Sequence, residues 1–265
     1  DSRGPGPRPG QVLGLSDLAA VVGAVLDRRL DPGSAAPIAV ALSGGGDSRA
    51  LTLIAVDWAQ ARGRRLAILT VDHGLNPDSA GWSADCAALA VRLDASFHPL
   101  SWTGEKPAHG LPAAARAARH RLLADAARAI GASVILMGHT ASDLAEAAAM
   151  RAEGSTTPSP REWAPSPVWP EGRGVFLLRP MLAVSRQQVR DWLGEHGESW
   201  IDDPANDDPR FARARARLAG AEAPAPPEPP APQLAALAAA AEVDAAGVVT
   251  LPRTGLPPRL VAAAA

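Results

Sequence analysis

The chain has 265 residues, and its 26 Lys and Arg against 28 Asp and Glu give a formal net charge of −2. No overall basic charge favours nucleic acid, so any contact with RNA must come from local arginine clusters. The single cysteine, Cys86, excludes intrachain disulfides and Cys-x-x-Cys metal or redox motifs, which is consistent with a reducing cytoplasm. We find neither a signal peptide nor a transmembrane run and expect a cytoplasmic protein with no membrane partner.

Strands and helices are predicted to alternate along most of the chain. Residues 1–10 are rich in Gly, Pro and Arg and are expected to be disordered, and Ser16 is the expected N-cap of a helix ending at Leu30. The next expected strands are 38–42, 66–71, 96–100 and 134–137, and the expected helices are 48–62, 79–93, 112–130 and 142–152. This alternation predicts an α/β fold, a doubly wound parallel sheet flanked by helices and Rossmann-like.

The remainder of the sequence is more irregular. Residues 154–174 read as a long loop, 175–178 as a short strand and 185–196 as a helix capped by Ser185. We expect a catalytic domain over 11–218, a Pro/Ala linker over 219–232 and a small C-terminal helical extension over 233–265, with a helix at 233–245. The extension is expected to be truncated.

A glycine-rich turn follows the first predicted strand, and its residues are Ser43, Gly44, Gly45, Gly46, Asp47 and Ser48. Glycines allow backbone N–H groups to converge on an anion, and the following helix adds its own N-terminal N–H groups. The turn lacks the Gly-Lys-[Ser/Thr] ending of a Walker A site, but Asp47 suits a magnesium ion that bridges to pyrophosphate. An ordinary tight turn is the alternative, which the flanking serines and the acid disfavour.

A second polar segment follows the strand at 134–137. His139, Asp143 and Glu146 stand at i, i+4 and i+7, so they share one helical face if the helix begins early. We predict that Asp143 helps Asp47 to hold magnesium and that His139 meets phosphate or base. An exposed polar stripe is the alternative, and zinc lacks a third ligand of soft type.

Other candidate residues lie near the same edge of the predicted sheet. Asp72 and His73 follow the strand at 66–71 and could line a nucleotide site or merely cap a turn. Arg116 and Arg119 could neutralise charge on a triphosphate or lie on a solvated helix face. The run of Arg213, Arg215 and Arg217 could likewise be solvated or could bind an RNA backbone.

These motifs together resemble a known family. The segment 43–48 resembles the Ser-Gly-Gly-x-Asp-Ser loop of N-type ATP pyrophosphatases, the PP-loop superfamily, which has an adenine nucleotide alpha hydrolase-like fold. Further segments resemble tRNA(Ile)-lysidine synthetases in order and spacing from about residue 38 to 218. They are 71–75, 79–82, 113–120, 138–146, 179–182 and 200–207.

The resemblance implies a reaction, its cofactors and its site. That family uses ATP and Mg²⁺ to ligate free L-lysine to C2 of the wobble cytidine of tRNA(Ile) with a CAU anticodon, through an adenylated cytidine. By resemblance, ATP binds at Ser43, Gly44, Gly45, Gly46, Asp47, Ser48, Asp72, His73 and Gly138, and the metal binds at Asp47 and Asp143. The catalytic residues would be Asp47, Arg119, His139, Asp143 and Glu146, with Arg116, Arg179 and Arg213 near the substrate or tRNA.

The sequence also departs from the family pattern and leaves alternatives open. Pro112, Ser142 and Ala214 stand where the family usually has Glu, Asp and Asn. Another PP-loop enzyme acting on tRNA is a second reading, although thiolation members usually need several cysteines. A non-catalytic nucleotide- or RNA-binding module is a third, which Asp47 and Asp143 disfavour. Family members are often dimers, so a homodimer is also considered.

Overall fold

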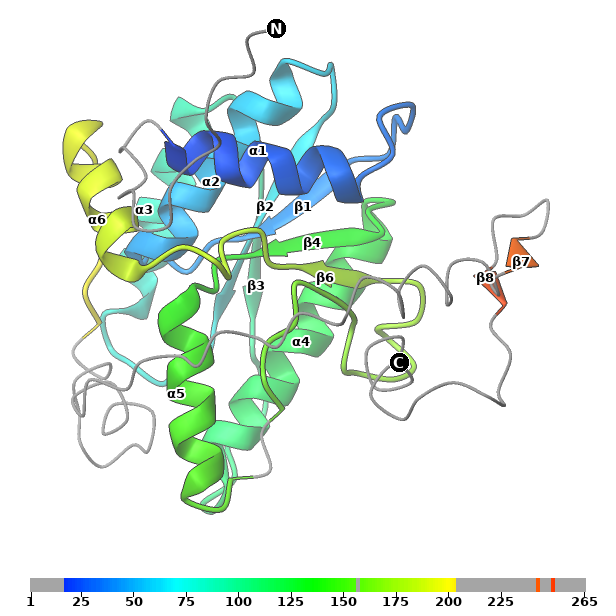
Figure 1. Ribbon diagram of the computed structural model, residues 1–265. Helices are drawn as coiled ribbons and strands as arrows, with labels where there is room; N and C mark the ends of the chain where they lie inside the picture. Colours follow the sequence, from blue (N-terminus) through cyan, green and yellow to red (C-terminus); the bar gives the residue numbers. More distant parts are fainter. Residues whose placement is uncertain (1–16, 156–157, 204–241, 244–248, 251–265) are drawn as a thin grey trace, which may run out of the picture. The chain divides into compact units, whose positions relative to one another are not determined.

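The computed structural model describes residues 17–155, 158–203, 242–243 and 249–250 (Figure 1). The chain divides into two compact units, Asp1–Ala223 and Pro224–Ala265. In the second unit, β7 (Glu242–Val243) pairs antiparallel with β8 (Val249–Thr250). The predicted helix at 233–245 is therefore wrong at 242–243, where the β-branched Val243 favours a strand. Its other residues, like Ser16 and Arg213, lie outside the described residues.

A six-stranded sheet forms the centre of the first unit, in the order β3-β2-β1-β4-β6-β5. Five strands are parallel, and they are β1 (Ile38–Ala41), β2 (Leu66–Asp72), β3 (Ser96–Ser101), β4 (Val134–Met137) and β6 (Phe176–Leu178). The predicted doubly wound α/β fold is confirmed, because the strand order reverses on either side of β1.

The predicted loop over 154–174 is wrong at one place. Residues Trp163–Pro165 form β5, which pairs antiparallel with β6 at the edge of the sheet. Three residues are too few to show an alternating pattern. Pro165 is tolerated because an edge strand does not need every N–H group for the ladder.

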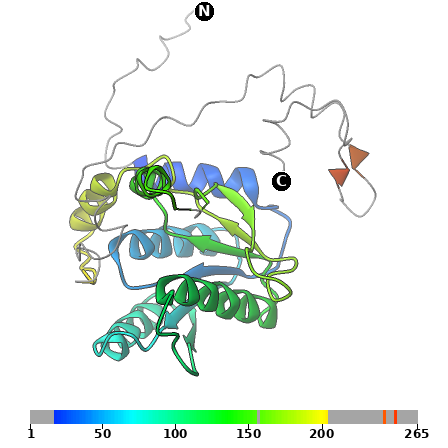
Figure 2. The ribbon, with the colours of Figure 1, turned by 90° about the horizontal axis from the view of Figure 1, so that it is seen from below.

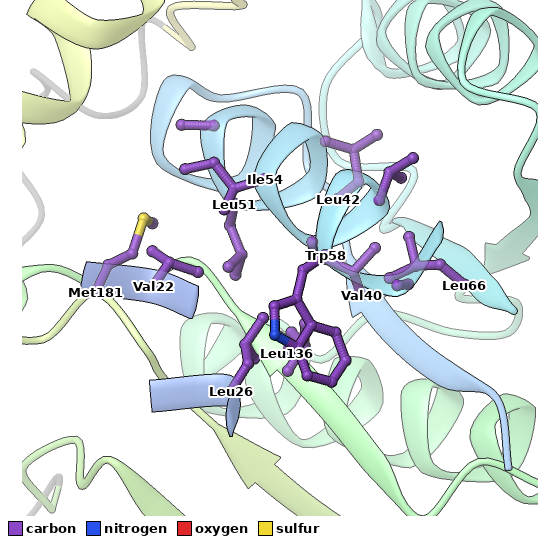
Figure 3. Packing of buried hydrophobic residues seen from close by; sticks show 14 of the residues in the cluster. Val22, Leu26, Val40, Leu42, Leu51, Ile54, Trp58, Leu66, Leu136 and Met181 are labelled. Carbon is purple, nitrogen blue, oxygen red and sulfur yellow. The ribbon is translucent and has the colours of Figure 1, made fainter. Parts of the chain in front are cut away.

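Helices cover both faces of the sheet, and Figure 2 shows the strands between α1 and α4. Buried side chains of four helices pack on one face: α1 (Asp17–Arg29), α2 (Gly46–Gln60), α3 (Ser79–Arg92) and α6 (Arg186–Glu195). Figure 3 shows part of this cluster, with Leu51, Ile54 and Trp58 of α2 near Val40 and Leu136. The opposite face packs on α4 (Leu111–Ala129) through Leu123 and Ala127.

Neighbouring residues of the strands supply the two cores. Val40 faces the α2 side and Ala39 the α4 side, and Leu136 and Ile135 divide in the same way. Helix α5 (Ala141–Ala152) follows β4. No helix in the described part of the chain is long and apolar enough to span a lipid bilayer.

The carboxyl ends of β1 and β4 lie side by side, because Ala41 is in register with Met137. The chain leaves β1 toward α2 and leaves β4 toward α5, and in an open α/β sheet such a reversal point forms a crevice for ligands. The glycine turn and the segment at 138–146 meet at this crevice.

Candidate functional site

Two glycines allow close approaches at the glycine turn, Gly138 to the backbone after β1 and Gly44 to the segment after α6. A Cβ atom on Gly138 would lie 2.8 Å from the backbone N and Cα atoms of Ser48, so only glycine fits there. Gly44 has a φ of +87°, and a Cβ at this position would lie 2.4 Å from Cδ1 of Ile201. The N–H group of Ile201 donates a hydrogen bond to the Gly44 carbonyl at 3.0 Å, which places the segment after α6 against the glycine turn.

Hydroxyl groups hold the glycine turn from inside. The Oγ of Ser48 accepts a hydrogen bond from the backbone N–H of Ser43 at 3.2 Å and donates one to the Gly45 carbonyl at 2.9 Å. Helix α2 begins at Gly46, two residues earlier than predicted, and its N-cap residue Gly45 has no side chain to cap it. The first-turn N–H groups of α2 therefore remain suited to an anion.

An acidic cluster lies next to the glycine turn and consists of Asp47, Asp143 and Glu146 around the guanidinium of Arg186. The Nε of Arg186 lies 3.4 Å from Oδ2 of Asp47, its Nη1 3.2 Å from Oε1 of Glu146 and its Nη2 4.0 Å from Oδ2 of Asp143. The Asp143 and Glu146 side chains are buried, whereas that of Asp47 keeps 19% of its surface exposed. The structure thus brings the three predicted acids together.

Arg186 balances the buried negative charge. Burial raises the pKa of Asp47 above its ordinary value, although the Arg186 guanidinium opposes this shift. Burial lowers the pKa of Arg186, but Asp47, Glu146 and Asp143 outweigh this effect and raise it above its ordinary value. The acidic cluster is therefore organised around a cation that belongs to the protein itself.

The sequence reasoning missed Arg186, although a signal was present. Ser185 caps α6 by accepting the backbone N–H of Gln188, so Arg186 is the first residue of that helix. A positive side chain in the first turn of a helix interacts unfavourably with the helix dipole. Arg186 is therefore expected to pair with acidic side chains from elsewhere in the fold.

Helix α5 begins at Ala141, so the expectation that His139 shares a helical face with the two acids is not met. His139 precedes the helix, and Thr140 is its N-cap residue. Asp143 accepts a hydrogen bond from the backbone N–H of Thr140 at 2.8 Å, which fixes its carboxylate at the start of α5. Asp143 and Glu146 are three residues apart and both reach Arg186.

A basic cluster lies on the α4 side of the same edge, and its members are Arg116, Arg119, His120, His139 and Arg179. The Arg179 side chain is buried; its Nε donates to Nδ1 of His139 at 3.0 Å, and its Nη1 donates to the Arg161 carbonyl at 2.7 Å. Since Nδ1 of His139 accepts, a neutral ring carries its proton on Nε2. Burial and then the charge of Arg116 lower the pKa of Arg179 to about 10.

His120 is the deepest member of the basic cluster, with 3% of its surface exposed. Both of its ring nitrogens are buried and have no hydrogen-bond partner. Burial lowers the pKa of His120 to about 3, and the neighbouring charges of Arg119, Arg116 and Arg179 act in the same direction. His120 is therefore a neutral ring in positive surroundings.

Asp72 and His73 lie at the carboxyl end of β2, as predicted, and the geometry favours a turn role for the first. The Asp72 carboxylate accepts a hydrogen bond from the Gly74 N–H at 2.7 Å, which is the geometry of an Asx turn. Burial lowers the pKa of His73, and the charge of Arg119 lowers it further, so His73 lies near the basic cluster.

The donor set of the acidic cluster fits magnesium in its chemistry. Mg²⁺ is commonly held by one or two carboxylates together with substrate phosphates and water. Asp47 and Asp143 offer hard oxygen ligands, and Asp143 contributes to the raised pKa of Asp47, so the two carboxylates are near each other. Within the described residues, no group of three or more His, Cys, Asp or Glu is arranged to hold a metal by protein ligands alone.

Known sequences resemble this chain over most of its length. The profile of the PP-loop domain family matches residues 21–220. The chain is 56% identical to a tRNA(Ile)-lysidine synthase of Caulobacter vibrioides over 91% of its own length and 58% of the relative's. It is 42% identical to the corresponding synthase of Hyphomonas neptunium over 75% of its own length and 53% of the relative's. The chain thus spans just over half the length of these curated relatives.

Solved structures share the fold at low sequence identity. The U34-tRNA thiolase NcsA of Methanococcus maripaludis matches with a TM-score of 0.64 at 14% identity, over 77% of this chain and 71% of the thiolase. The NMN synthetase of Francisella tularensis matches with a TM-score of 0.52 at 14% identity, over 80% of this chain and 89% of the synthetase. At these identities the likeness concerns the fold alone.

Proposed function

We propose, from the premise that this chain belongs to the PP-loop domain family, that it ligates lysine to the wobble cytidine of tRNA(Ile) with a CAU anticodon. The observation that carries the proposal is the convergence of the glycine turn, Asp47, Asp143 and Glu146 at one sheet edge. The 56% identity to a tRNA(Ile)-lysidine synthase supports this choice of reaction.

The glycine turn would bind the phosphates of ATP. Helix α2 follows β1 directly, so its N-terminus lies at the carboxyl edge of the sheet, where the helix dipole favours an anion. Ser43 and Ser48 hold the turn in shape through their hydroxyls, so little reorganisation is needed when the nucleotide arrives.

Asp47 and Asp143 would hold Mg²⁺. When bound, the ion would neutralise phosphate charge and stabilise pyrophosphate as a leaving group. The ion pairs between Arg186 and these carboxylates must then weaken or break. Its guanidinium, freed at the edge of the glycine turn, is suited to a phosphate oxygen.

The chemistry proceeds in two steps. The C2 carbonyl oxygen of cytosine attacks the α-phosphorus of ATP, and the bond to pyrophosphate breaks. The ε-amine of lysine then attacks C2, and AMP leaves with the former carbonyl oxygen. Glu146 is suited to bind the ammonium and to accept the proton that the amine must lose. His139 is suited to donate from Nε2 to a phosphate or base oxygen.

Contacts with tRNA would involve more than the described site. The target base must leave its stack to enter a narrow site. Arg213 lies outside the described residues, and its contact with tRNA remains a prediction. A cytoplasmic location and a homodimer also remain predictions.

A transfer assay tests the proposal. The chain is incubated with ATP, Mg²⁺, labelled lysine and tRNA(Ile), with the same tRNA carrying U at the wobble position as the control. We expect lysine transfer to the first tRNA alone, with one AMP and one pyrophosphate released per lysine. A folded protein that binds ATP but transfers no lysine would contradict the proposal, and a thiolation enzyme or a binding module would give this result.

A further inference from the structure

The chain after α6 returns to the glycine turn through a helix cap built around one glycine. Gly197 has a φ of +65°, which glycine adopts readily, and its N–H group donates to the Gly194 carbonyl at 3.1 Å. The N–H group of Glu198 donates to the Leu193 carbonyl at 2.9 Å, so α6 ends in a Schellman motif. This cap turns the chain out of the helix and begins the segment 198–203.

The segment 198–203 contacts the glycine turn at two points. The N–H group of Ile201 donates to the carbonyl of Gly44, the residue of the turn that has a positive φ. A Cβ atom on Gly46 would lie 3.4 Å from Cγ of Trp200, so this indole lies beside the first residue of α2. The segment therefore borders the backbone to which the proposed function assigns the phosphates.

A buried carboxylate, that of Glu198, fixes the start of this segment. Its Oε2 accepts hydrogen bonds from Nε of Arg49 at 3.0 Å and from Nη2 of Arg92 at 2.8 Å, and its Oε1 lies 2.6 Å from Nη1 of Arg92. Only 9% of the Glu198 side chain is exposed. Arg92 and then Arg49 hold the pKa of its carboxyl below the ordinary value, against the effect of burial. Charge thus ties the segment to α2 and α3 at once.

Arg49 connects this carboxylate to the glycine turn. Arg49 follows Ser48 directly, and its backbone N–H group donates to the Gly45 carbonyl at 3.0 Å. Its guanidinium pairs with Glu198 at 2.9 Å, and its side chain is largely buried. The backbone of the turn and the carboxylate of the segment are therefore held by one residue.

Other contacts fix the segment less firmly. A cavity of 310 Å³ is lined by residues of both α3 and the segment, among them Leu89 and Trp200, so side chains do not fill this space. Arg190 and Asp202 approach to 3.9 Å, but both side chains are exposed, and such pairs contribute little. Glu198 is therefore the main side-chain anchor of the segment.

We propose that Glu198 is a positioning residue for the phosphates of the nucleotide. It keeps the segment 198–203 against the glycine turn, and the segment keeps Gly44 in the conformation that binds phosphate. The inference rests on the proposed function, in which this turn binds ATP. A carboxylate would repel a phosphate in direct contact, so Glu198 acts through the segment. Without it, the turn adopts the binding conformation for only a fraction of the time, and the affinity falls by that fraction.

ATP binding and amide hydrogen exchange of the full chain test the proposal. In Glu198→Gln, the dissociation constant for ATP, measured by calorimetry, should rise by about tenfold, as expected if about a tenth of the molecules keep the binding conformation. The Ile201 amide should exchange faster, because its hydrogen bond to Gly44 opens more often. The reference is the Ile38 amide, which donates to the Arg65 carbonyl in the core. Ile201 should accelerate by about tenfold more than Ile38, whereas a general loss of stability would accelerate both equally.

Matched variants separate the ion pair from other effects. Arg92→Gln, a change at a half-exposed position, should weaken ATP binding in the same direction but less, because Arg49 still pairs with Glu198. It replaces Glu198→Gln in the test if that variant does not fold. The double variant should bind ATP no more weakly than Glu198→Gln, because both changes break one interaction. Glu198→Asp keeps the charge and should recover most of the affinity. Glu195→Gln, at an exposed position of α6, is the control and should match the unmodified protein.

Two results would overturn the inference. One is an unchanged affinity for ATP in folded Glu198→Gln. The other is an Ile201 amide that accelerates no more than the Ile38 amide. Neither depends on lysine transfer. A chain that needs Glu198 to bind ATP but transfers no lysine refutes only the ligation, and a chain that transfers lysine with an unchanged ATP affinity in Glu198→Gln refutes only the positioning role.

Discussion

The acidic and basic clusters share one sheet edge but differ in how their charge is balanced. The acidic cluster contains its own counter-ion, because the Arg186 guanidinium lies among three carboxylates. The basic cluster instead keeps one member, His120, neutral and without hydrogen-bond partners. If Mg²⁺ binds as proposed, it must displace a protein group on the α2 side, whereas the α4 side holds a buried ring whose nitrogens have no hydrogen-bond partner.

The largest expected effect comes from removing the acid of the glycine turn. Asp47→Asn should lower the rate of pyrophosphate release by about 10³-fold, because a preorganised charge at the phosphates is lost. Its thermal midpoint should stay or rise, since burial already raises the pKa of this carboxyl. Asp57→Asn, at an exposed position of the same helix, is the control. A rate close to that of the unmodified protein would remove Asp47 from the mechanism.

The next prediction separates the two loops that build the acidic cluster. In Gly138→Ala, a Cβ atom would lie 2.8 Å from the Ser48 backbone, so one loop must move. Moving Asp143 away from Asp47 should reduce the rate by about 10²-fold, the loss typical of a displacement near 1 Å. Gly81→Ala, where a Cβ meets nothing within 4 Å, should keep its rate. If both variants react at equal rates, the close approach of the loops is not needed.

The third prediction concerns His120 and the pH dependence of the unfolding free energy. The unfolded chain binds a proton on His120 below about pH 6.5, whereas the folded chain does so only near pH 3. As the pH falls from 6.5, the unfolding free energy should therefore drop by about 1.4 kcal/mol per unit on account of this residue. His120→Gln should flatten the slope measured by denaturant unfolding between pH 6.5 and 5.

His109→Gln, at an exposed position, should leave that slope unchanged. A slope in His120→Gln equal to that of the unmodified protein would show that His120 is not held neutral by the fold.

The smallest expected effect tests the internal counter-ion. Arg186→Gln removes a positive charge 3.4 Å from Asp47, so binding of Mn²⁺, used as a probe for Mg²⁺, should tighten by about tenfold. Electron paramagnetic resonance measures the free Mn²⁺ directly. Arg121→Gln, which removes an exposed arginine of α4 that pairs with Glu171, is the control. Weaker Mn²⁺ binding in folded Arg186→Gln would mean that the guanidinium organises the acids rather than competing for them.

The sequence predicts the parallel strands and the glycine turn because their signals are local. The apolar run at 66–71 and the three glycines after β1 each lie within a few residues. The sequence does not predict strand β5, because Trp163–Pro165 is stabilised by its pairing with β6 rather than by an alternating pattern of its own residues. Asp143 and Glu146 are recognisable because they share a short helical segment.

Arg186 and the environment of His120 could not be predicted in the same way. Arg186 contacts Asp47 and Glu146, which lie 139 and 40 residues away in the sequence. His120 looks like one more residue of an arginine-rich helix until folding places Arg179 near it. Both properties depend on tertiary contacts rather than on local pattern.

The most direct test of the account is a crystal structure with a non-hydrolysable ATP analogue and Mn²⁺, located by its anomalous signal. We expect the phosphates on residues 43–48 and the Mn²⁺ peak at Asp47 and Asp143. The contradicting result is nucleotide bound elsewhere with the glycine turn empty. One such place is the 540 Å³ cavity at the opposite edge of the sheet, lined in part by Arg64, Arg65 and His98.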